Sequence, residues 1–208
     1  MADLEALKEA VMSGDQETAV ELTMAAMNDK TGPEKILKQG LIAAMDTIGG
    51  KFARNEVYIP EILIAARAMK SAMEILEPAL AKAGVKPVGK FVIGTVEGDM
   101  HDIGKNLVAM MMKGAGFEVI DLGVDVSAEK FVEQAKSVNA QIIGMSALLT
   151  TTMPSMESVV KAVKKAGIKT KVMVGGAPVT ADYASNIGAD GFAQDAATAV
   201  TVAKGLVA

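Results

Sequence analysis

The chain has 208 residues, a formal net charge of −4 and no cysteine. This length is sufficient for one large domain or two small ones, each with a buried core. The lack of cysteine excludes disulfides, thiolate nucleophiles and iron–sulfur ligation, and the acidic balance gives no support for nucleic-acid binding. No window approaches a membrane-spanning apolar helix, and the N-terminus lacks a signal-peptide pattern. We therefore expect a cytoplasmic protein with neither membrane nor nucleic-acid partners.

The N-terminal part of the sequence predicts a four-helix bundle. Apolar residues recur at helical spacing from residue 4 to about 83, with breaks at 13–15 and 31–34 and a fourth helix beginning near Tyr58. Four helices of these lengths make a small bundle. The segment 83–89 contains two glycines and a proline and is the expected linker. We accordingly place one domain at 1–88 and a second at 89–208.

The second part of the sequence alternates short β-branched runs with helical segments. The expected strands are 90–95, 118–122, 141–145, 171–174 and 191–193, and the expected helices lie near 103–115, 127–138, 153–166, 180–186 and 195–206. This alternation predicts right-handed crossovers and a parallel sheet covered on both faces. We expect a Rossmann-like (flavodoxin-like) doubly wound domain with five strands.

The only histidine, His101, lies between the first expected strand and the helix that follows it. Ligands of open α/β sheets bind at the carboxyl ends of the strands. Asp99 can accept a hydrogen bond from one imidazole nitrogen and leave the other as an oriented lone pair. A lone histidine is more often a surface or core residue, but the aspartate and the nearby Gly98 and Gly104 favour a ligand site.

Two further loops follow strands at the same expected edge of the sheet. Four hydroxyl side chains fall within residues 146–152, a pattern that is also compatible with a helix cap and a polar turn. Gly175 and Gly176 follow the fourth strand, where missing side chains let a ligand approach the backbone. Three such loops on one edge predict a polar-walled slot for a ligand.

Common reaction chemistries fit these residues poorly. The sequence has no second histidine for a nucleophilic triad, no P-loop and no cysteine for a closed zinc site. It also lacks the aspartate after strand three and the lysine after strand five that a phosphoacceptor receiver domain requires. The pattern instead indicates a large cofactor whose metal takes one imidazole from the protein.

The motif Asp99-x-His101-x-x-Gly104, followed by Ser146-x-Leu148 and the Gly175–Gly176 pair, resembles the cobalamin-binding signature of methionine synthase and of corrinoid proteins in methylotrophic methyltransferase systems. Two other segments, 55–61 and 66–69, resemble the helical cap that precedes the corrinoid domain in those proteins. The resemblance covers nearly the whole chain. It implies that the cofactor is cobalamin or a related corrinoid, bound with its own nucleotide base displaced.

The resemblance also implies roles for individual residues. His101 would be the lower axial ligand of cobalt, Asp99 would hydrogen-bond the imidazole, and Ser146 would hydrogen-bond Asp99 in a relay to solvent. The displaced nucleotide tail would enter the slot between Ser146, Thr150 and the glycine pair. The other contacts expected for the corrinoid are Gly98, Met100, Asp102, Ile103, Gly104, Leu148, Gly175, Gly176 and Ala177.

In the helical half, the resemblance implies a cover for the upper face of the corrin. Tyr58 is the residue expected above the cobalt, with Ala65 further along the same helix face. Methionine synthase has a larger aliphatic residue at the place of Ala65, so the upper pocket here would be roomier. Ordinary core packing is the alternative interpretation of this helix face.

The implied function is that of a corrinoid methyl carrier, which is not a catalyst alone. Its partners would be a substrate:corrinoid methyltransferase, a second methyltransferase acting on coenzyme M or tetrahydrofolate, and a reductive activase. Two alternatives share the signature, namely a cobalamin-dependent sensor or regulator and the small subunit of an adenosylcobalamin mutase. Without the resemblance, a flavodoxin-like nucleotide binder is a further alternative.

Overall fold

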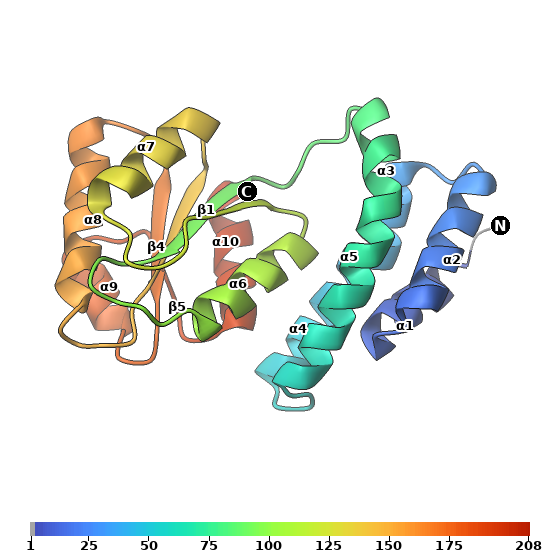
Figure 1. Ribbon diagram of the computed structural model, residues 1–208, viewed down its shortest axis with the longest axis horizontal. Helices are drawn as coiled ribbons and strands as arrows, with labels where there is room; N and C mark the ends of the chain where they lie inside the picture. The colour runs from blue at the N-terminus through green and yellow to red at the C-terminus, as the bar shows by residue number, and fades with distance from the viewer. Residues whose placement is uncertain (1–2) are drawn as a thin grey trace. The chain divides into compact units, whose positions relative to one another are not determined.

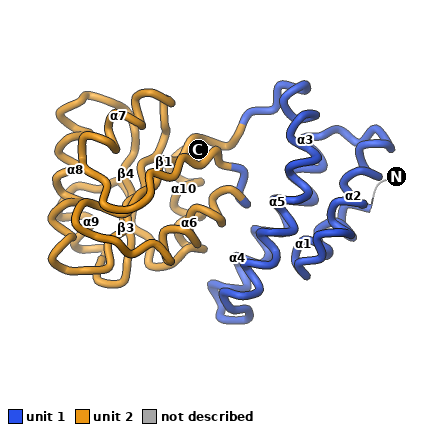
Figure 2. Tube along the Cα trace, viewed as in Figure 1, with its two compact units in different colours: residues 1–86, 114–116 blue, residues 87–113, 117–208 orange. Residues whose placement is uncertain are grey.

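The computed structural model describes residues 3–208, which divide into two compact units (Figure 1, Figure 2). The first unit contains the chain up to Lys86 together with Gly114–Gly116. The second contains Pro87–Lys113 and Phe117–Ala208. Within residues 3–208, no helix combines the length and the apolar character that crossing a bilayer requires.

The first unit is helical, as predicted. Its elements are α1 (Leu4–Ser13), α2 (Gln16–Asn28), α3 (Pro33–Lys35), the π-helical segment η1 (Ile36–Ile42), α4 (Ala43–Ala53) and α5 (Ile59–Lys82). Elements α3, η1 and α4 follow one another without a break and form one continuous helix. Together with α1, α2 and α5 it makes four helices among the described residues. Asp3 and Asp15 accept hydrogen bonds from amides in the first turns of α1 and α2, which is why these helices begin there.

The π-helical segment η1 packs closely against α1. A Cβ at Gly40 would lie 2.7 Å from the side chain of Leu7, so a larger residue would require this buried leucine to shift. Leu7 and Ile36 are both fully buried. The core of this unit therefore forms where η1 and α5 pack on α1.

The second unit contains a five-stranded parallel sheet in the order β2-β1-β3-β4-β5. The strands are β1 (Lys90–Thr95), β2 (Glu118–Asp121), β3 (Ile142–Ser146), β4 (Lys171–Gly175) and β5 (Gly191–Ala193). The helices are α6 (Ile103–Gly114), α7 (Ala128–Val138), α8 (Met153–Ala166), α9 (Ala181–Ile187) and α10 (Ala196–Val207). Helices α7, α8 and α9 lie on one side of the sheet, and α6 and α10 lie on the other (Figure 1). The predicted doubly wound, flavodoxin-like fold is confirmed.

The carboxyl ends of the three inner strands are level with one another. In the register of the sheet, Thr95 of β1 pairs with Ser146 of β3, and Ser146 pairs with Gly175 of β4. Each of these residues is the last of its strand. The three loops identified in the sequence therefore leave the sheet side by side, at the edge where this fold class binds ligands.

Candidate functional site

The loop that carries His101 is anchored at both of its ends. Where it leaves β1, the hydroxyl of Thr95 donates to the carbonyl oxygen of His101 at 2.8 Å. Where it enters α6, the carbonyl oxygen of Asp102 accepts from the amide of Asn106 at 2.7 Å. The side chain of His101 is 51% exposed, whereas that of Asp99 is completely buried. The loop thus presents an imidazole on a fixed, buried carboxylate.

Asp99 determines how the imidazole is oriented. Its Oδ1 lies 2.7 Å from Nδ1 of His101 and also accepts from the His101 amide at 3.1 Å. Because an ionised carboxylate can only accept, we assign the proton of the neutral imidazole to Nδ1. None of the described residues hydrogen-bonds Nε2, and the side chain is half exposed, so this nitrogen is available to a ligand. Histidines that ligate a metal usually donate their other ring N–H to a carboxylate in this way.

The second carboxylate oxygen of Asp99 is held by the loop after β3. Oδ2 accepts from the Leu148 amide at 2.8 Å, from the Leu149 amide at 3.3 Å and from the hydroxyl of Thr152 at 2.8 Å. Burial acts to raise the pKa of Asp99, but the hydrogen bonds from Leu148, His101 and Thr152 outweigh it and hold the pKa well below its ordinary value. Asp99 is therefore a permanent anion behind the imidazole.

The predicted hydrogen bond from Ser146 to Asp99 is wrong. Ser146 ends β3 beside Thr95 and is not among the groups that donate to the Asp99 carboxylate. The donors come instead from the turn after the strand, and the hydroxyl among them belongs to Thr152. Thr152 is buried and was included in the predicted run of hydroxyl residues, but no sequence signal singled it out.

The glycine pair after β4 also has a reason within the protein itself. Gly176 has a φ of 132°, and a Cβ there would lie only 1.9 Å from the carbonyl oxygen of Ala147, so glycine is required where the β4 loop packs against the β3 loop. A Cβ at Gly175 would lie 2.8 Å from the carbonyl oxygen of Ala193 in β5. The predicted contact of the pair with a ligand stays a prediction. Ala177, which follows them, is exposed.

The surface around His101 suits a large, flat, partly apolar ligand. Met100 and Ile103 are 68% and 81% exposed, and Leu148 is also exposed. A Cβ at Gly104 would meet no atom within 4 Å, so the first turn of α6 leaves open space at this glycine. Exposed apolar side chains next to an oriented imidazole nitrogen fit a corrin ring that carries its own metal.

Three other predicted contact residues lie in the same loops. Gly98 has a φ of 83° and turns the chain into the Asp99 segment. Asp102 is exposed, and its carboxylate accepts from the side chain of Asn106 at 2.9 Å. Thr150 is exposed on the turn after β3. All three border the open surface that His101 occupies.

The side chains that could ligate a metal are scattered in this structure. Within residues 3–208, no group of three or more His, Cys, Asp or Glu side chains is arranged to hold a metal ion. One protein nitrogen is sufficient where a macrocycle supplies the remaining ligands.

Of the two residues predicted above the corrin, Tyr58 is exposed and Ala65 is not. Tyr58 is the N-cap of α5 and is 69% exposed, and its amide donates to the carboxylate of Glu61 at 3.1 Å. Ala65 is 0% exposed and belongs to the core, so its contact with the cofactor stays a prediction. Tyr58 has extended backbone before the first helical turn, where helical periodicity does not apply.

Lys105 is a buried charge that the sequence reasoning did not single out. Its ammonium group pairs with the carboxylate of Asp121 at the end of β2 and donates to the side-chain oxygen of Asn106 at 2.7 Å. The pair ties the first turn of α6 to the edge strand, directly after the open space at Gly104. Lys105 directly follows Gly104 of the sequence motif, and this position is the signal that could have identified it.

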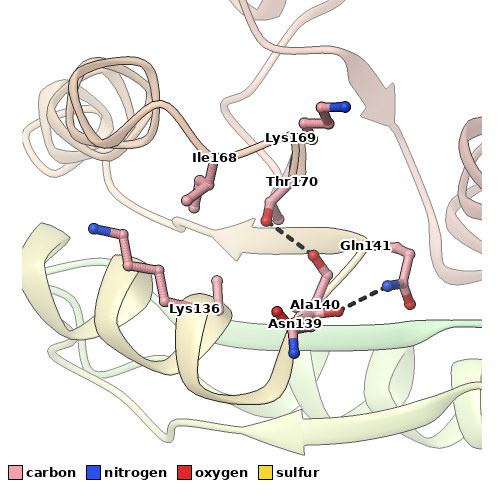
Figure 3. Close-up of a pocket in the computed structure, with 8 residues that line it drawn as sticks. Lys136, Asn139, Ala140, Gln141, Ile168, Lys169 and Thr170 are labelled. Carbon is pink, nitrogen blue, oxygen red and sulfur yellow. Dashed lines mark hydrogen bonds between the residues drawn. The ribbon is translucent and has the colours of Figure 1, made fainter.

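A cavity of about 340 Å³ lies at the opposite edge of the sheet (Figure 3). It is lined by the end of α7 and by the residues that lead into β3 and β4, including Lys136, Asn139 and Lys169. The Thr170 hydroxyl donates to the Ala140 carbonyl at 2.9 Å, so part of its polar wall is already paired. Because it lies at the amino ends of the strands, it is not part of the His101 site.

Comparison with known proteins agrees with this geometry. Residues 89–202 match a family model described as a B12 binding domain, and residues 3–77 match a second B12 binding domain. Dimethylamine corrinoid protein 3 of Methanosarcina acetivorans is 43% identical, and the match covers both chains completely. The fold and the site thus define a corrinoid-binding protein.

Two solved structures extend the match to three dimensions. A cobalamin-binding protein from Desulfitobacterium hafniense is 34% identical with a TM-score of 0.83 and full coverage of both chains. The methanol:cobalamin methyltransferase complex of Methanosarcina barkeri has a TM-score of 0.86 at 28% identity, over 98% of this chain and 79% of that chain. This chain belongs to the corrinoid protein family of such methyltransferase systems, and the predicted corrinoid cofactor is confirmed.

Proposed function

We propose that this chain is a methyl carrier whose His101 is the lower axial ligand of the corrinoid cobalt. Residues 1–88 would form the cap and residues 89–208 the corrinoid domain. The observation that carries the proposal is the free Nε2 of His101, held on Asp99 at 2.7 Å through Nδ1. The bound corrinoid would supply a cobalt that accepts a methyl group from one enzyme and releases it to another.

The residues of this chain act on that cobalt through the imidazole. Asp99 keeps the proton on Nδ1, so Nε2 is available as an electron-pair donor. The amides of Leu148 and Leu149 and the hydroxyl of Thr152 keep the carboxylate ionised. A fixed anion behind the imidazole holds the ring in one orientation and would stabilise the ligated state.

The other predicted contacts are proposed to hold the cofactor rather than to react. The apolar side chains of Met100, Ile103 and Leu148 would pack along the corrin, and Gly104 leaves the space for it. The nucleotide tail would lie between Ser146, Thr150 and the Gly175–Gly176 pair, at the carboxyl ends of β3 and β4. Tyr58 is retained as a proposed cap residue because it is exposed.

The proposed partners follow from the relatives. One relative is a dimethylamine corrinoid protein, and another is part of a complex with a methanol methyltransferase. We propose a substrate:corrinoid methyltransferase as the first partner, a second methyltransferase acting on coenzyme M or tetrahydrofolate, and a reductive activase. Loaded protein mixed with a dimethylamine or a methanol methyltransferase, each with its substrate, should change its corrinoid absorbance with one enzyme only.

Selective isotope labelling tests the cobalt ligand directly, because His101 is the only histidine. In the cobalt(II) form, natural-abundance protein should give an electron paramagnetic resonance signal split into triplets by one nitrogen. Protein grown with ¹⁵N-histidine should give doublets instead. Splitting that does not respond to the label would come from the base of the corrinoid itself and would refute His101 as the ligand.

A further inference from the structure

Asp125 stands out as a strained residue next to the site. It lies between β2 and α7 and has a φ of 52°, one of four positive φ values among the described non-glycine residues. A left-handed backbone is unfavourable for residues that carry a side chain, although Asp and Asn tolerate it better than most. Surrounding contacts must therefore hold Asp125 in this conformation.

Those contacts go to the loop that carries His101. The amide of Asp125 donates to the carbonyl oxygen of Asp99 at 3.0 Å. Its Oδ1 accepts from the amide of Gly98 at 2.7 Å. The next residue, Val126, donates to the carbonyl of Thr95 at 3.0 Å. The segment thus continues the pairing with β1 beyond the end of the strand and finishes on Asp99.

Asp99 is consequently held from two sides. The amide of Leu148 and the hydroxyl of Thr152 bind its carboxylate, while Asp125 binds its backbone carbonyl and the preceding amide. The orientation of His101 depends on where Oδ1 of Asp99 lies. A shift of the Asp99 backbone would therefore turn the imidazole.

We propose that Asp125 is a positioning residue for His101. It fixes the backbone at Gly98 and Asp99, which keeps the imidazole and its Nε2 in one orientation. The inference rests on the proposed ligation by His101, but the positioning itself is a property of the protein without cofactor.

Three variants separate the hydrogen bond from the backbone conformation. Asp125→Gly allows the left-handed conformation and removes the acceptor for the Gly98 amide. Asp125→Asn keeps an acceptor oxygen and also tolerates this conformation. Asn139→Gly is the matched control, because Asn139 has a φ of 53° and ends α7 at the other edge of the sheet.

Two measurements report on the imidazole. In cofactor-free protein labelled with ¹⁵N-histidine, nuclear magnetic resonance of the single imidazole gives its tautomer and its mobility. In loaded cobalt(II) protein, the nitrogen splitting gives the ratio of ligated to unligated histidine. We expect Asp125→Gly to broaden or shift the imidazole signal and to lower that ratio by about tenfold, the lower end of outer-shell effects. Asp125→Asn and Asn139→Gly should match the parent.

Two results would overturn the proposal. The first is a folded Asp125→Gly protein, checked by circular dichroism, that matches the parent in both measurements. The second is an equal loss in Asp125→Asn, which retains the acceptor and the conformation. A parent protein without histidine nitrogen on cobalt would refute the proposed ligand instead. A changed imidazole signal in cofactor-free Asp125→Gly would then still support the positioning role.

Discussion

Asp99 accepts every hydrogen bond that reaches its carboxylate. The donors are the amide and Nδ1 of His101 on one oxygen, and the amides of Leu148 and Leu149 with the Thr152 hydroxyl on the other. Because the carboxylate only accepts hydrogen bonds, replacement of Asp99 by asparagine is not conservative here. Asparagine has the same shape but replaces one of these acceptors with two N–H donors.

Asp99→Asn should therefore destabilise the protein. Whichever way the amide is turned, its NH₂ group faces N–H or O–H donors, and a buried donor without a partner costs about 1–3 kcal/mol. We expect the free energy of unfolding in urea, followed by circular dichroism, to fall by about that amount. Asp102→Asn is the control, since Asp102 is exposed and asparagine can still accept from Asn106.

The stability difference between parent and Asp99→Asn should depend on pH. The pKa of Asp99 in the folded protein lies below that of the unfolded chain. Stabilisation by the charge is therefore complete above the ordinary value of about 4 and decreases as the pH falls below it. Equal stability of the two proteins at pH 7 would contradict the hydrogen-bond arrangement described for Asp99.

Replacement of Thr152 tests whether its hydroxyl, rather than that of Ser146, is the side-chain donor that stabilises Asp99. Thr152→Val keeps the approximate volume but removes a buried hydroxyl donor from Asp99, so we expect a loss of about 1–2 kcal/mol in unfolding free energy. Thr152→Ser should retain most of the stability, and Ser146→Ala should have little effect. A larger loss for Ser146→Ala than for Thr152→Val, measured by urea unfolding, would restore Ser146 to the role first predicted.

At the scale of elements, two glycines of the site differ in what surrounds them. Gly176 packs its backbone onto Ala147, whereas Gly104 faces open space at the start of α6. Both belong to the same signature in the sequence, but only the first has a reason in the folded protein alone. The second is free to serve a ligand.

Alanine at these glycines should consequently have opposite effects. Gly176→Ala should destabilise the protein by several kcal/mol, because its Cβ would collide with the Ala147 carbonyl oxygen. Gly104→Ala should stabilise the cofactor-free protein by about 0.5–1 kcal/mol, since alanine favours a helix. It should also weaken corrinoid binding, measured by absorbance titration. Unchanged affinity in Gly104→Ala would place the corrin elsewhere.

The elements of the fold could be predicted from the sequence because their periodicities differ clearly. The site was predicted only in part. Asp99 and His101 are two residues apart in the chain, so their contact is local. Thr152 is one of three consecutive threonines, and only the path of the turn after β3 decides which hydroxyl is buried. Tyr58 and Ala65 were expected on one helix face, but Tyr58 precedes the first turn of α5, which helical spacing alone does not reveal.

At the scale of the whole molecule, each compact unit contains one of the two tyrosines. Tyr58 begins α5 in the first unit, and Tyr183 lies in α9 of the second, where its hydroxyl donates to the Met153 carbonyl. Fluorine labelling of tyrosine therefore gives one resonance for each unit. The two resonances can report separately on the unfolding of the two units.

Corrinoid should raise the unfolding temperature reported by Tyr183. A ligand at 100 times its dissociation constant stabilises the folded state by about 2.7 kcal/mol. We expect a smaller shift in His101→Ala at the same corrinoid concentration. A shift confined to Tyr58, or an equal shift in His101→Ala, would contradict a cofactor site at the carboxyl edge of the sheet.

The separation of Asp99 from its partners along the chain has a consequence for biosynthesis. Leu148 and Thr152 follow Asp99 by 49 and 53 residues. At a synthesis rate of about 5–20 residues per second, the ribosome adds that length in about 3–10 s. During this interval His101 already exists, but the groups that hold its aspartate do not. If His101 holds the cofactor as proposed, we expect loading to follow translation of β3 and the turn after it.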